Sequence, residues 1–258
     1  MLTFKNVNRI GILLFLVLLL LKVVYSISLF WVIALLLIWI ILTTIGSFHI
    51  RWNYFLKAQH NSPDVKDEVI SLTFDDGPDK EYTPQVLELL KKYHFKATFF
   101  LIGNKIEKNP ELVEEIINQG HTIGNHTFSH SNNFGFLKTN EVIYDLKKAN
   151  GLIEKFQDIK LNLYRPAFGV TNPRISKAVK ELKLKPIGWS VRSLDTTQDS
   201  KGKIVKRVTK NLKKGDVVLL HDTSKKTVEV LEQLLIFIEK KKWTSITVDQ
   251  LLNLKANA

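Results

Sequence analysis

The chain divides into two parts by the distribution of its apolar and polar residues. Residues 10–48 are almost wholly apolar, whereas apolar and charged positions are mixed from about residue 61 onward. A helix needs about 20 apolar residues to cross the hydrocarbon core of a bilayer, so the apolar stretch has room for two such helices. We predict one span near residues 7–24 and a second near 27–47, with Lys22 reaching toward an interface.

A cleaved secretory signal is the competing interpretation of this N-terminal stretch. The apolar run is too long for a signal, and no small-x-small cleavage pattern precedes Tyr25. We therefore expect a membrane anchor of one or two transmembrane helices over residues 1–48, a short connector over 49–63 and a folded domain over 64–258. The lipid bilayer is accordingly an expected partner of this chain.

The orientation of the anchor depends on the number of spans. The charged residues before Asp64 are all basic, and four of them flank the apolar stretch: Lys5, Arg9, Arg51 and Lys57. Basic residues beside a span favour the cytoplasmic side of the membrane. A hairpin of two spans would put both of its ends in the cytoplasm, whereas a single span would put the following domain outside.

The pattern after residue 63 alternates between apolar strands and amphipathic helices. Several helix starts are marked by a capping residue followed by proline, as in Asn109-Pro110 and Asn172-Pro173. Seven short apolar runs are typical of buried strands: residues 69–74, 97–102, 121–124, 163–165, 185–189, 216–220 and 245–248. The alternation over about 195 residues predicts an α/β fold, a distorted (β/α) barrel of about seven parallel strands, with a doubly wound open sheet as the alternative.

Composition narrows the chemistry that this domain can perform. The chain has no cysteine, which excludes disulfides, thiolate metal sites and cysteine nucleophiles. The formal net charge is +12, and the lysine-rich helices that carry much of it predict a solvated basic surface, with anionic lipid or an anionic polymer as alternatives. We find no aromatic-basic motif of the kind that binds RNA, so we expect no nucleic-acid partner.

The informative polar residues follow the predicted strands. In parallel βα folds, catalytic groups lie on the loops after the carboxyl ends of the strands. Seven side chains of this chain fall in such places: Asp75, Asp76, His126, His130, Arg165, Asp195 and His221. Their shared position predicts one site at one end of the sheet.

The residue types in this set point to metal chemistry. His126 and His130 are four residues apart, and on one helical turn both rings would face the same point. Two imidazoles and a carboxylate form a ligand set typical of catalytic zinc, which leaves a position open for water. The alternative is two exposed histidines in a polar loop, which we would favour without the neighbouring Asp75-Asp76 pair. One carboxylate would bind the metal and the other would act as a base.

Two other histidines differ in their predicted tasks. His221 ends a different strand, and it is the candidate acid that protonates a leaving amine. His121 lies at the start of a strand, away from the proposed site, so we interpret it as structural.

Four motifs in a fixed order resemble those of a known family. They are TFDDGP at residues 73–78, HTFSH at 126–130, RPAFG at 165–169 and LLHD at 219–222. Together they resemble the polysaccharide deacetylases, carbohydrate esterase family 4, whose catalytic unit is the NodB-homology domain. The resemblance covers about residues 68–250, and the ordered combination is far more specific than any single motif.

The resemblance implies a role for each matching residue. Asp75 would be the catalytic base, oriented by Arg165, and His221 the general acid. The metal, most simply Zn²⁺, would be held by Asp76, His126 and His130. The substrate-binding wall would include Phe168, Leu219 and Trp189. Phe168 stands where the family often has tyrosine; its backbone N–H would help to stabilise the oxyanion, and Leu219 would receive the acetyl methyl group.

The fourth family motif is only partly present. The family often has Asp-x-x-Asp-Trp, and this chain has Arg192 and Thr196 at the first and last of these positions. Asp195 aligns with the carboxylate that tunes the catalytic histidine. The resemblance therefore implies a catalytic role for Asp195 but leaves the neighbouring substrate wall different from the common pattern.

We therefore expect a membrane-anchored, metal-dependent hydrolase that removes N-acetyl groups from the amino sugars of a glycan. The expected partner is peptidoglycan, a chitooligosaccharide-like polymer or an exopolysaccharide, and the expected location is a bacterial plasma membrane with the domain on the extracytoplasmic side. The alternatives are a deformylase or deacetylase of a lipid-linked sugar at the membrane face, and a catalytically retired membrane protein that binds glycan.

Overall fold

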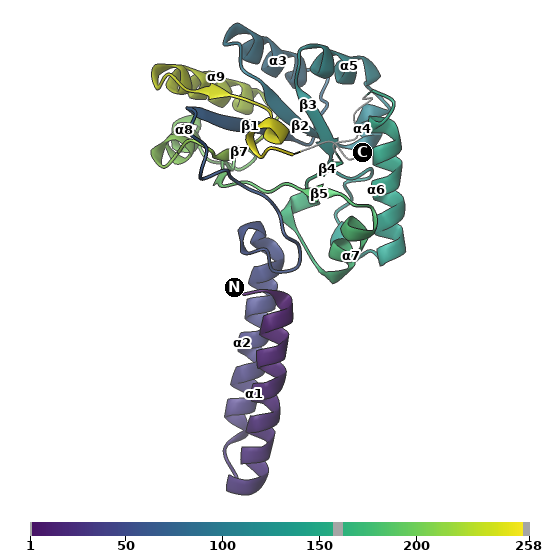
Figure 1. Ribbon diagram of the computed structural model, residues 1–258, viewed down its shortest axis with the longest axis vertical. Helices are drawn as coiled ribbons and strands as arrows, with labels where there is room; N and C mark the ends of the chain where they lie inside the picture. Colours follow the sequence, from purple (N-terminus) through teal and green to yellow (C-terminus); the bar gives the residue numbers. More distant parts are fainter. Residues whose placement is uncertain (1, 157–161, 255–258) are drawn as a thin grey trace.

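The computed structural model describes residues 2–156 and 162–254. Figure 1 shows a long helical hairpin that projects from an α/β domain, with the N-terminus at the end of the hairpin nearest the domain. The hairpin consists of α1 (Phe4–Tyr25) and α2 (Leu29–Phe48), which are about 33 and 30 Å long at 1.5 Å per residue. Both predicted spans therefore lie largely within helices, and each helix is long and apolar enough to cross a membrane.

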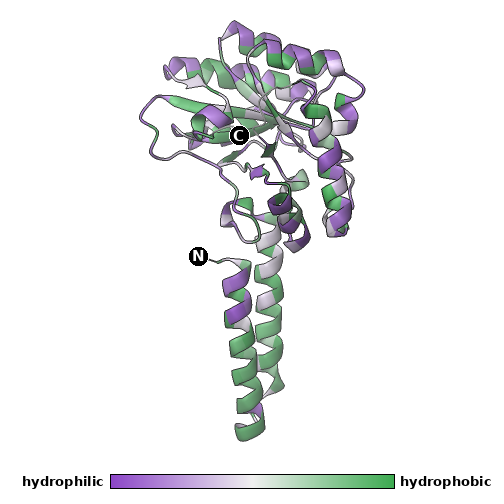
Figure 2. Ribbon diagram, turned by 45° about the vertical axis from the view of Figure 1, so that its right-hand side comes forward, coloured by the Kyte–Doolittle hydropathy of each residue, from purple (hydrophilic) through white to green (hydrophobic). Residues whose placement is uncertain are grey.

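Short polar residues form the turn between the two helices. Ser26 has a positive φ of 49° and ends α1, and Ser28 accepts the backbone N–H of Phe30 at 3.2 Å to cap α2. Figure 2 shows that most of the hairpin is hydrophobic, and most of its apolar side chains are exposed. Among the described residues that follow the hairpin, the exposed large hydrophobic side chains are Phe136, Tyr144 and Phe168. The hairpin thus presents an apolar surface that the rest of the described chain does not cover.

The domain is built on one curled sheet whose strand pairs are all parallel. Its order is β5 (Lys185–Pro186), β4 (Leu163–Tyr164), β3 (Thr122–Asn125), β2 (Ala97–Leu101), β1 (Val69–Asp75), β7 (Val217–His221) and β6 (Val191–Arg192), and β8 (Thr244–Ser245) also pairs with β1. The predicted distorted (β/α) barrel is confirmed. The helices of the domain are α3 (Tyr82–Lys92), α4 (Gly103–Ile106), α5 (Pro110–Asn118), α6 (Thr139–Ile153), α7 (Pro173–Glu181), α8 (Lys201–Lys210), α9 (Lys225–Lys240) and α10 (Val248–Leu251).

Two predicted strands differ from the observed ones. The run at 185–189 contributes only β5, and the separate strand β6 begins at Val191. The run at 245–248 ends as a strand at Ser245, because Thr247 takes the extended N-cap conformation and α10 begins at Val248. Short apolar runs do not distinguish a strand from the first turn of a buried helix.

Side chains along β1 point alternately into the hydrophobic core beneath the helices and into the interior of the barrel. Every residue of β1 is buried, yet its apolar members Ile70, Leu72 and Phe74 belong to the cluster packed beneath α3, α5, α8 and α9. Successive side chains of a strand point to opposite faces, so Thr73 and Asp75 point to the other face. The central strand thereby supplies polar groups to the inside of the curled sheet.

The segment that leaves the hairpin spans the open seam of the barrel. Gln59 forms a bridge with Ile187 just after β5, and Asn61 forms one with Asp216 just before β7. The segment between hairpin and domain is thus hydrogen-bonded to the domain next to β5 and next to β7, including Gly188 N–H to Gln59 O at 2.7 Å.

Candidate active site

The two adjacent carboxylates lie at the carboxyl end of the central strand. Asp75 is in register with His221 on β7 and with Phe100 on β2. Asp76 has left the strand and has a positive φ of 72°, so its carboxylate diverges from that of Asp75. Such backbone conformations cost a non-glycine residue about 1–3 kcal/mol and cluster at functional sites.

Neighbouring groups hold the turn after Asp76 in place. Lys105 on α4 donates from Nζ to the carbonyl of Asp76 at 2.7 Å. A Cβ at Gly77 would collide with the buried carboxylate of Asp222, so the turn can approach Asp222 only with glycine at this position. Thr83 donates from its hydroxyl to Asp222 at 2.5 Å. Burial raises the pKa of Asp222 to about 7.

Arg165 is completely buried beside Asp75, as its predicted orienting role requires. Its Nη1 donates to Asp75 Oδ1 at 2.8 Å and to the hydroxyl of Thr73 at 2.7 Å. Nη2 donates to Gly188 O at 2.9 Å and Nε to Ile187 O at 3.3 Å. A buried guanidinium is stable only when its charge and its donors are satisfied, so the same contacts that stabilise Arg165 also hold the Asp75 carboxylate in one orientation.

Three side chains converge as a candidate metal site. One ligand atom from each of Asp76, His126 and His130 lies within 4.8 Å of the others. Nε2 of His126 is 3.3 Å and Nε2 of His130 is 3.2 Å from Asp76 Oδ1. The backbone carbonyl of Arg165 lies 2.9 Å from Nδ1 of His126, which leaves Nε2 directed at the cluster.

The charges and the free atoms of this cluster suit a divalent metal. Burial would raise the pKa of Asp76, but its close contact with His126 and the charge of His130 lower it well below its usual value. Burial lowers the pKa of His130. Asp76 Oδ1 and His130 Nε2 are buried without a hydrogen-bond partner of good geometry in the described chain. An ionised carboxylate and neutral imidazoles with free ligand atoms are what zinc requires.

The two histidines meet through a loop, and the predicted helical turn is wrong. Residues 126–130 have no helical structure, and Thr127 and His130 have positive φ values of 70° and 45°. The buried carboxylate of Asp145 on α6 accepts the backbone N–H groups of Phe128 at 2.7 Å and Ser129 at 3.1 Å. The bend held by Asp145, and not a helical turn, brings His126 and His130 together. Their ring centroids are 4.9 Å apart.

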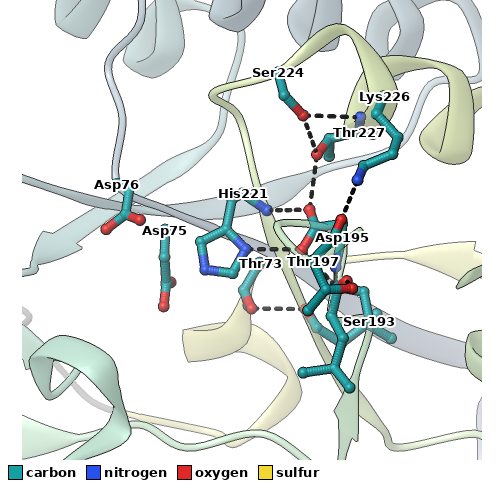
Figure 3. Close-up of polar contacts among 12 residues, drawn as sticks. Thr73, Asp75, Asp76, Ser193, Asp195, Thr197, His221, Ser224, Lys226 and Thr227 are labelled. Carbon is teal, nitrogen blue, oxygen red and sulfur yellow. Dashed lines mark hydrogen bonds and ion pairs between the residues drawn. The ribbon is translucent and has the colours of Figure 1, made fainter. Parts of the chain in front are cut away.

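His221 lies on the opposite side of Asp75 from the histidine pair and is bound by Asp195. Figure 3 shows the imidazole between the Asp75 and Asp195 carboxylates. Nδ1 of His221 lies 2.8 Å from Asp195 Oδ1, and the backbone N–H of His221 donates to Oδ2 at 2.8 Å. Burial would lower the pKa of His221, but the hydrogen bond and charge of Asp195 raise it to about 9.

Asp195 is fully buried and accepts two further hydrogen bonds. The hydroxyl of Ser193 donates to Oδ1 and that of Thr227 on α9 donates to Oδ2, both at 2.8 Å. Burial would raise the pKa of Asp195, but the hydrogen bond from His221 and the other donors lower it. The departures of the fourth motif at Arg192 and Thr196 therefore leave the Asp195–His221 pair in place.

These groups surround one cavity of about 290 Å³. The predicted substrate-binding residues Phe168, Leu219 and Trp189 all line it, together with Arg192. Phe168 has a positive φ of 57°, and Gly169 with a φ of 70° leaves room for the Trp189 ring. All ten predicted site residues thus lie in this cavity or are bonded directly to a residue that lines it.

Sequence reasoning missed the supporting residues Asp145, Thr227 and Lys105, which lie on helices outside the four motifs. Nothing in their local pattern distinguishes them from solvated helix positions. His121 was interpreted correctly as structural, because it is buried, accepts the Ala97 N–H at 3.2 Å and has a pKa lowered to about 4 by burial.

Comparison with known proteins assigns the chain to a family. The polysaccharide deacetylase family model matches residues 62–187. The chain is 40% identical over 196 residues to a peptidoglycan-N-acetylglucosamine deacetylase of Bacillus cereus, covering 73% of this chain and 90% of the relative. It is 30% identical over 227 residues to the peptidoglycan-N-acetylmuramic acid deacetylase PdaA of Bacillus subtilis, covering 79% and 86%.

A solved structure agrees with these sequence relatives. The Bc1960 peptidoglycan N-acetylglucosamine deacetylase superposes with a TM-score of 0.71 at 30% identity, over 77% of this chain and 94% of that one. The chain therefore belongs to the polysaccharide deacetylase family, as its four motifs predicted.

Proposed function

We propose that this chain is a membrane-anchored, metal-dependent N-deacetylase of amino sugars from a peptidoglycan-type glycan. Its anchor would be residues 1–48, joined by the connector 49–63 to the catalytic domain at 64–258. The observation that carries the proposal is the single cavity in which the Asp76–His126–His130 cluster meets Asp75 and His221. The names of the relatives support an acetamido sugar as substrate.

The metal site would be filled by zinc. Asp76, His126 and His130 would hold the zinc, which would supply Lewis-acid chemistry to an amide carbonyl and to water. The carboxylate of Asp75, oriented by Arg165 at 2.8 Å, accepts the proton of the attacking water. The new C–O bond forms at the acetamide carbon, and the backbone N–H of Phe168 stabilises the negative charge that develops on the carbonyl oxygen.

His221 completes the reaction as the acid. The C–N bond breaks, and His221 gives its proton to the departing nitrogen, so the products are acetate and the free amine of the sugar. A histidine whose pKa is about 9 carries this proton at neutral pH. Leu219 and Trp189 form the apolar wall that receives the acetyl methyl group.

The basic residues of the hairpin indicate on which side of the membrane this reaction would occur. At the domain end of the hairpin, α1 carries Lys5 and Arg9, and Arg51 follows α2, whereas Lys22 is the charged residue nearest the far turn. The excess of basic residues favours a cytoplasmic location for the domain end. Because a hairpin returns to the side of the membrane from which it starts, this excess supports a cytoplasmic location for the domain, and the extracytoplasmic location expected from the sequence is the alternative.

Acetate release by the full-length chain tests the proposed activity. The protein in lipid nanodiscs would be loaded with zinc and offered chitooligosaccharides, peptidoglycan fragments and their lipid-linked precursors. We expect acetate, its loss on chelation, its return with zinc, and no acetate from the Asp76→Asn variant. Zinc-loaded protein that releases acetate from none of these sugars would overturn the proposal and favour the retired glycan-binding alternative.

A further inference from the structure

A groove of about 480 Å³ lies beside the active-site cavity, where the domain meets the end of α2. Its hairpin wall is formed by Thr44, Ser47 and Phe48, and its domain wall includes Phe136 and Phe168. Phe168 also lines the active-site cavity, and its ring centroid lies 4.4 Å from that of His130. The groove thus reaches the candidate metal ligands through one aromatic side chain.

Exposed aromatic side chains gather in this groove. In the described domain, three large hydrophobic side chains are exposed, and two of them, Phe136 at 83% and Phe168 at 47%, line the groove. Phe48 of α2 faces the same groove and is 62% exposed. Exposed apolar surface of this kind marks a binding region for an apolar partner, and its place at the end of α2 puts it beside the bilayer.

Hydrogen bonds between the hairpin, the connector and the domain hold the groove at the domain end of α2. The backbone N–H of Thr171 donates to Ser47 O at 2.9 Å, and that of Phe4 donates to Tyr54 O at 2.9 Å. A Cβ at Gly46 would collide with the Tyr54 ring, which shows how closely α2 and the connector approach each other. The hydroxyl of Ser176 on α7 donates to Phe55 O at 2.7 Å.

One arginine lines the cavity beside Trp189, and a second contacts the backbone of the residue that follows Trp189. The guanidinium of Arg192 is 5.5 Å from the Trp189 ring and lines the cavity. Arg51, just after α2, donates to the carbonyl of Ser190 at 3.4 Å. Neither arginine forms an ion pair with a carboxylate in the described ranges 2–156 and 162–254. Unpaired guanidinium groups at a binding site are suited to phosphate.

We infer that the substrate is an N-acetylamino sugar joined through a diphosphate to a long prenyl chain and bound at the membrane surface. The inference rests on the proposed deacetylase activity and names its substrate class. The acetamido group lies between Asp75 and His221, the diphosphate lies at Arg192, and the first isoprene units cross Phe168 into the groove. A polymeric neutral glycan would use neither the arginines nor the apolar groove.

The test compares chain lengths on full-length protein in nanodiscs. The probes are N-acetylglucosamine diphosphate on an undecaprenyl chain, the same head group on a two-isoprene chain, and chitotetraose. Because a longer prenyl chain buries more apolar surface, we expect kcat/KM for acetate release to be at least about tenfold higher with the long chain than with the short one. Equal values, or preference for chitotetraose, would overturn the inference.

Variants link the preference to the groove and to the cation. A Cβ at Gly135 would meet Val170 at an ordinary 3.6 Å, so Gly135→Leu adds a side chain in the groove without a clash at Cβ. It should lower the long-to-short ratio about fivefold, relative to Gly151→Leu, whose Cβ meets nothing within 4 Å. Arg192→Ala should lower kcat/KM for the diphosphate sugars about tenfold, with a smaller loss on chitotetraose. An unchanged ratio in Gly135→Leu would contradict the groove.

A binding readout separates this inference from the proposed activity. An undecaprenyl diphosphate with a diazirine in its first isoprene unit should cross-link to the groove, at Phe136 or Phe168, in a chelator-treated sample. Cross-links confined to the outer face of α1 and α2 would overturn the groove assignment even if acetate is released. Groove cross-links without acetate from any probe would instead refute the deacetylase.

Discussion

The imidazole of His221 and the carboxylate of Asp195 are joined twice, through Nδ1 to Oδ1 and through the backbone N–H to Oδ2, both at 2.8 Å. The second bond fixes the position of the carboxylate relative to the strand, and the first fixes the tautomer and the charge of the ring. Nε2 is then the nitrogen that remains to exchange a proton with substrate. The contact therefore sets both the direction and the pH range of proton donation.

Asp195→Asn should shift the alkaline limb of the pH–rate profile to lower pH. The folded pKa of His221 is raised from 6.5 to about 9 chiefly by the Asp195 hydrogen bond and charge, against the effect of burial. Without that charge the proton is lost at lower pH, so activity should begin to fall nearer 6.5 than 9. The measurement is kcat against pH, with Asp199→Asn in the same loop as control. A limb that does not move would exclude His221 as the acid whose pKa Asp195 raises.

Asp75→Asn should abolish turnover and leave metal binding intact. Removing a general base typically costs 10²–10⁴ in rate, so we expect a loss of at least about 100-fold. The amide oxygen can still accept from Arg165, whereas Asp75→Ala would leave a buried guanidinium unpaired and cost about 3–5 kcal/mol of stability. Acetate release, bound zinc and thermal unfolding are measured together. The reciprocal pattern, loss of metal, is expected for Asp76→Asn, and loss of metal in Asp75→Asn would reverse the assigned roles.

Asp145 should control metal affinity without touching the metal. Its carboxylate holds two backbone N–H groups of the loop between His126 and His130, and loss of such outer contacts typically lowers affinity about 10–100-fold. Asp145→Ala should therefore bind zinc more weakly by about this factor. Asp145→Asn keeps one acceptor and should fall between it and the wild type. Zinc affinity is measured by calorimetric titration of the wild type and the two variants. Equal affinity in all three proteins would show that the loop holds its shape without Asp145.

The cysteine-free chain allows a direct test of the orientation of the hairpin. Tyr25 lies at the far turn, and Asn211 is exposed on the domain just after α8. In spheroplasts, an impermeant maleimide should label Tyr25→Cys directly and Asn211→Cys only after permeabilisation, because the basic residues gather at the domain end. The reverse pattern would place the domain outside and would remove cytoplasmic lipid-linked precursors as substrates.

Much of the site could be predicted from the sequence because the residues that carry the chemistry lie at the ends of strands. Asp75, Asp76 and His221 directly end or follow strands whose apolar character is local, and parallel strands bring their carboxyl ends to one edge. The four motifs then supplied the family. The helical turn assigned to residues 126–130 was wrong, because an i, i+4 spacing is consistent with a helix but also with a loop. What bends this loop is Asp145, 15 residues beyond His130.

Local composition and spacing were enough to predict the apolar hairpin, the alternating strands and helices, and the identity of the residues that bear the chemistry. Only the folded chain shows which helix residues support them and that the site lies near the domain end of the hairpin. Arg165 meets Asp75 across 90 residues, and Thr171 of the domain meets Ser47 of the hairpin. Such contacts depend on the packing of whole elements, which no local pattern encodes, and that packing places the groove against the active site.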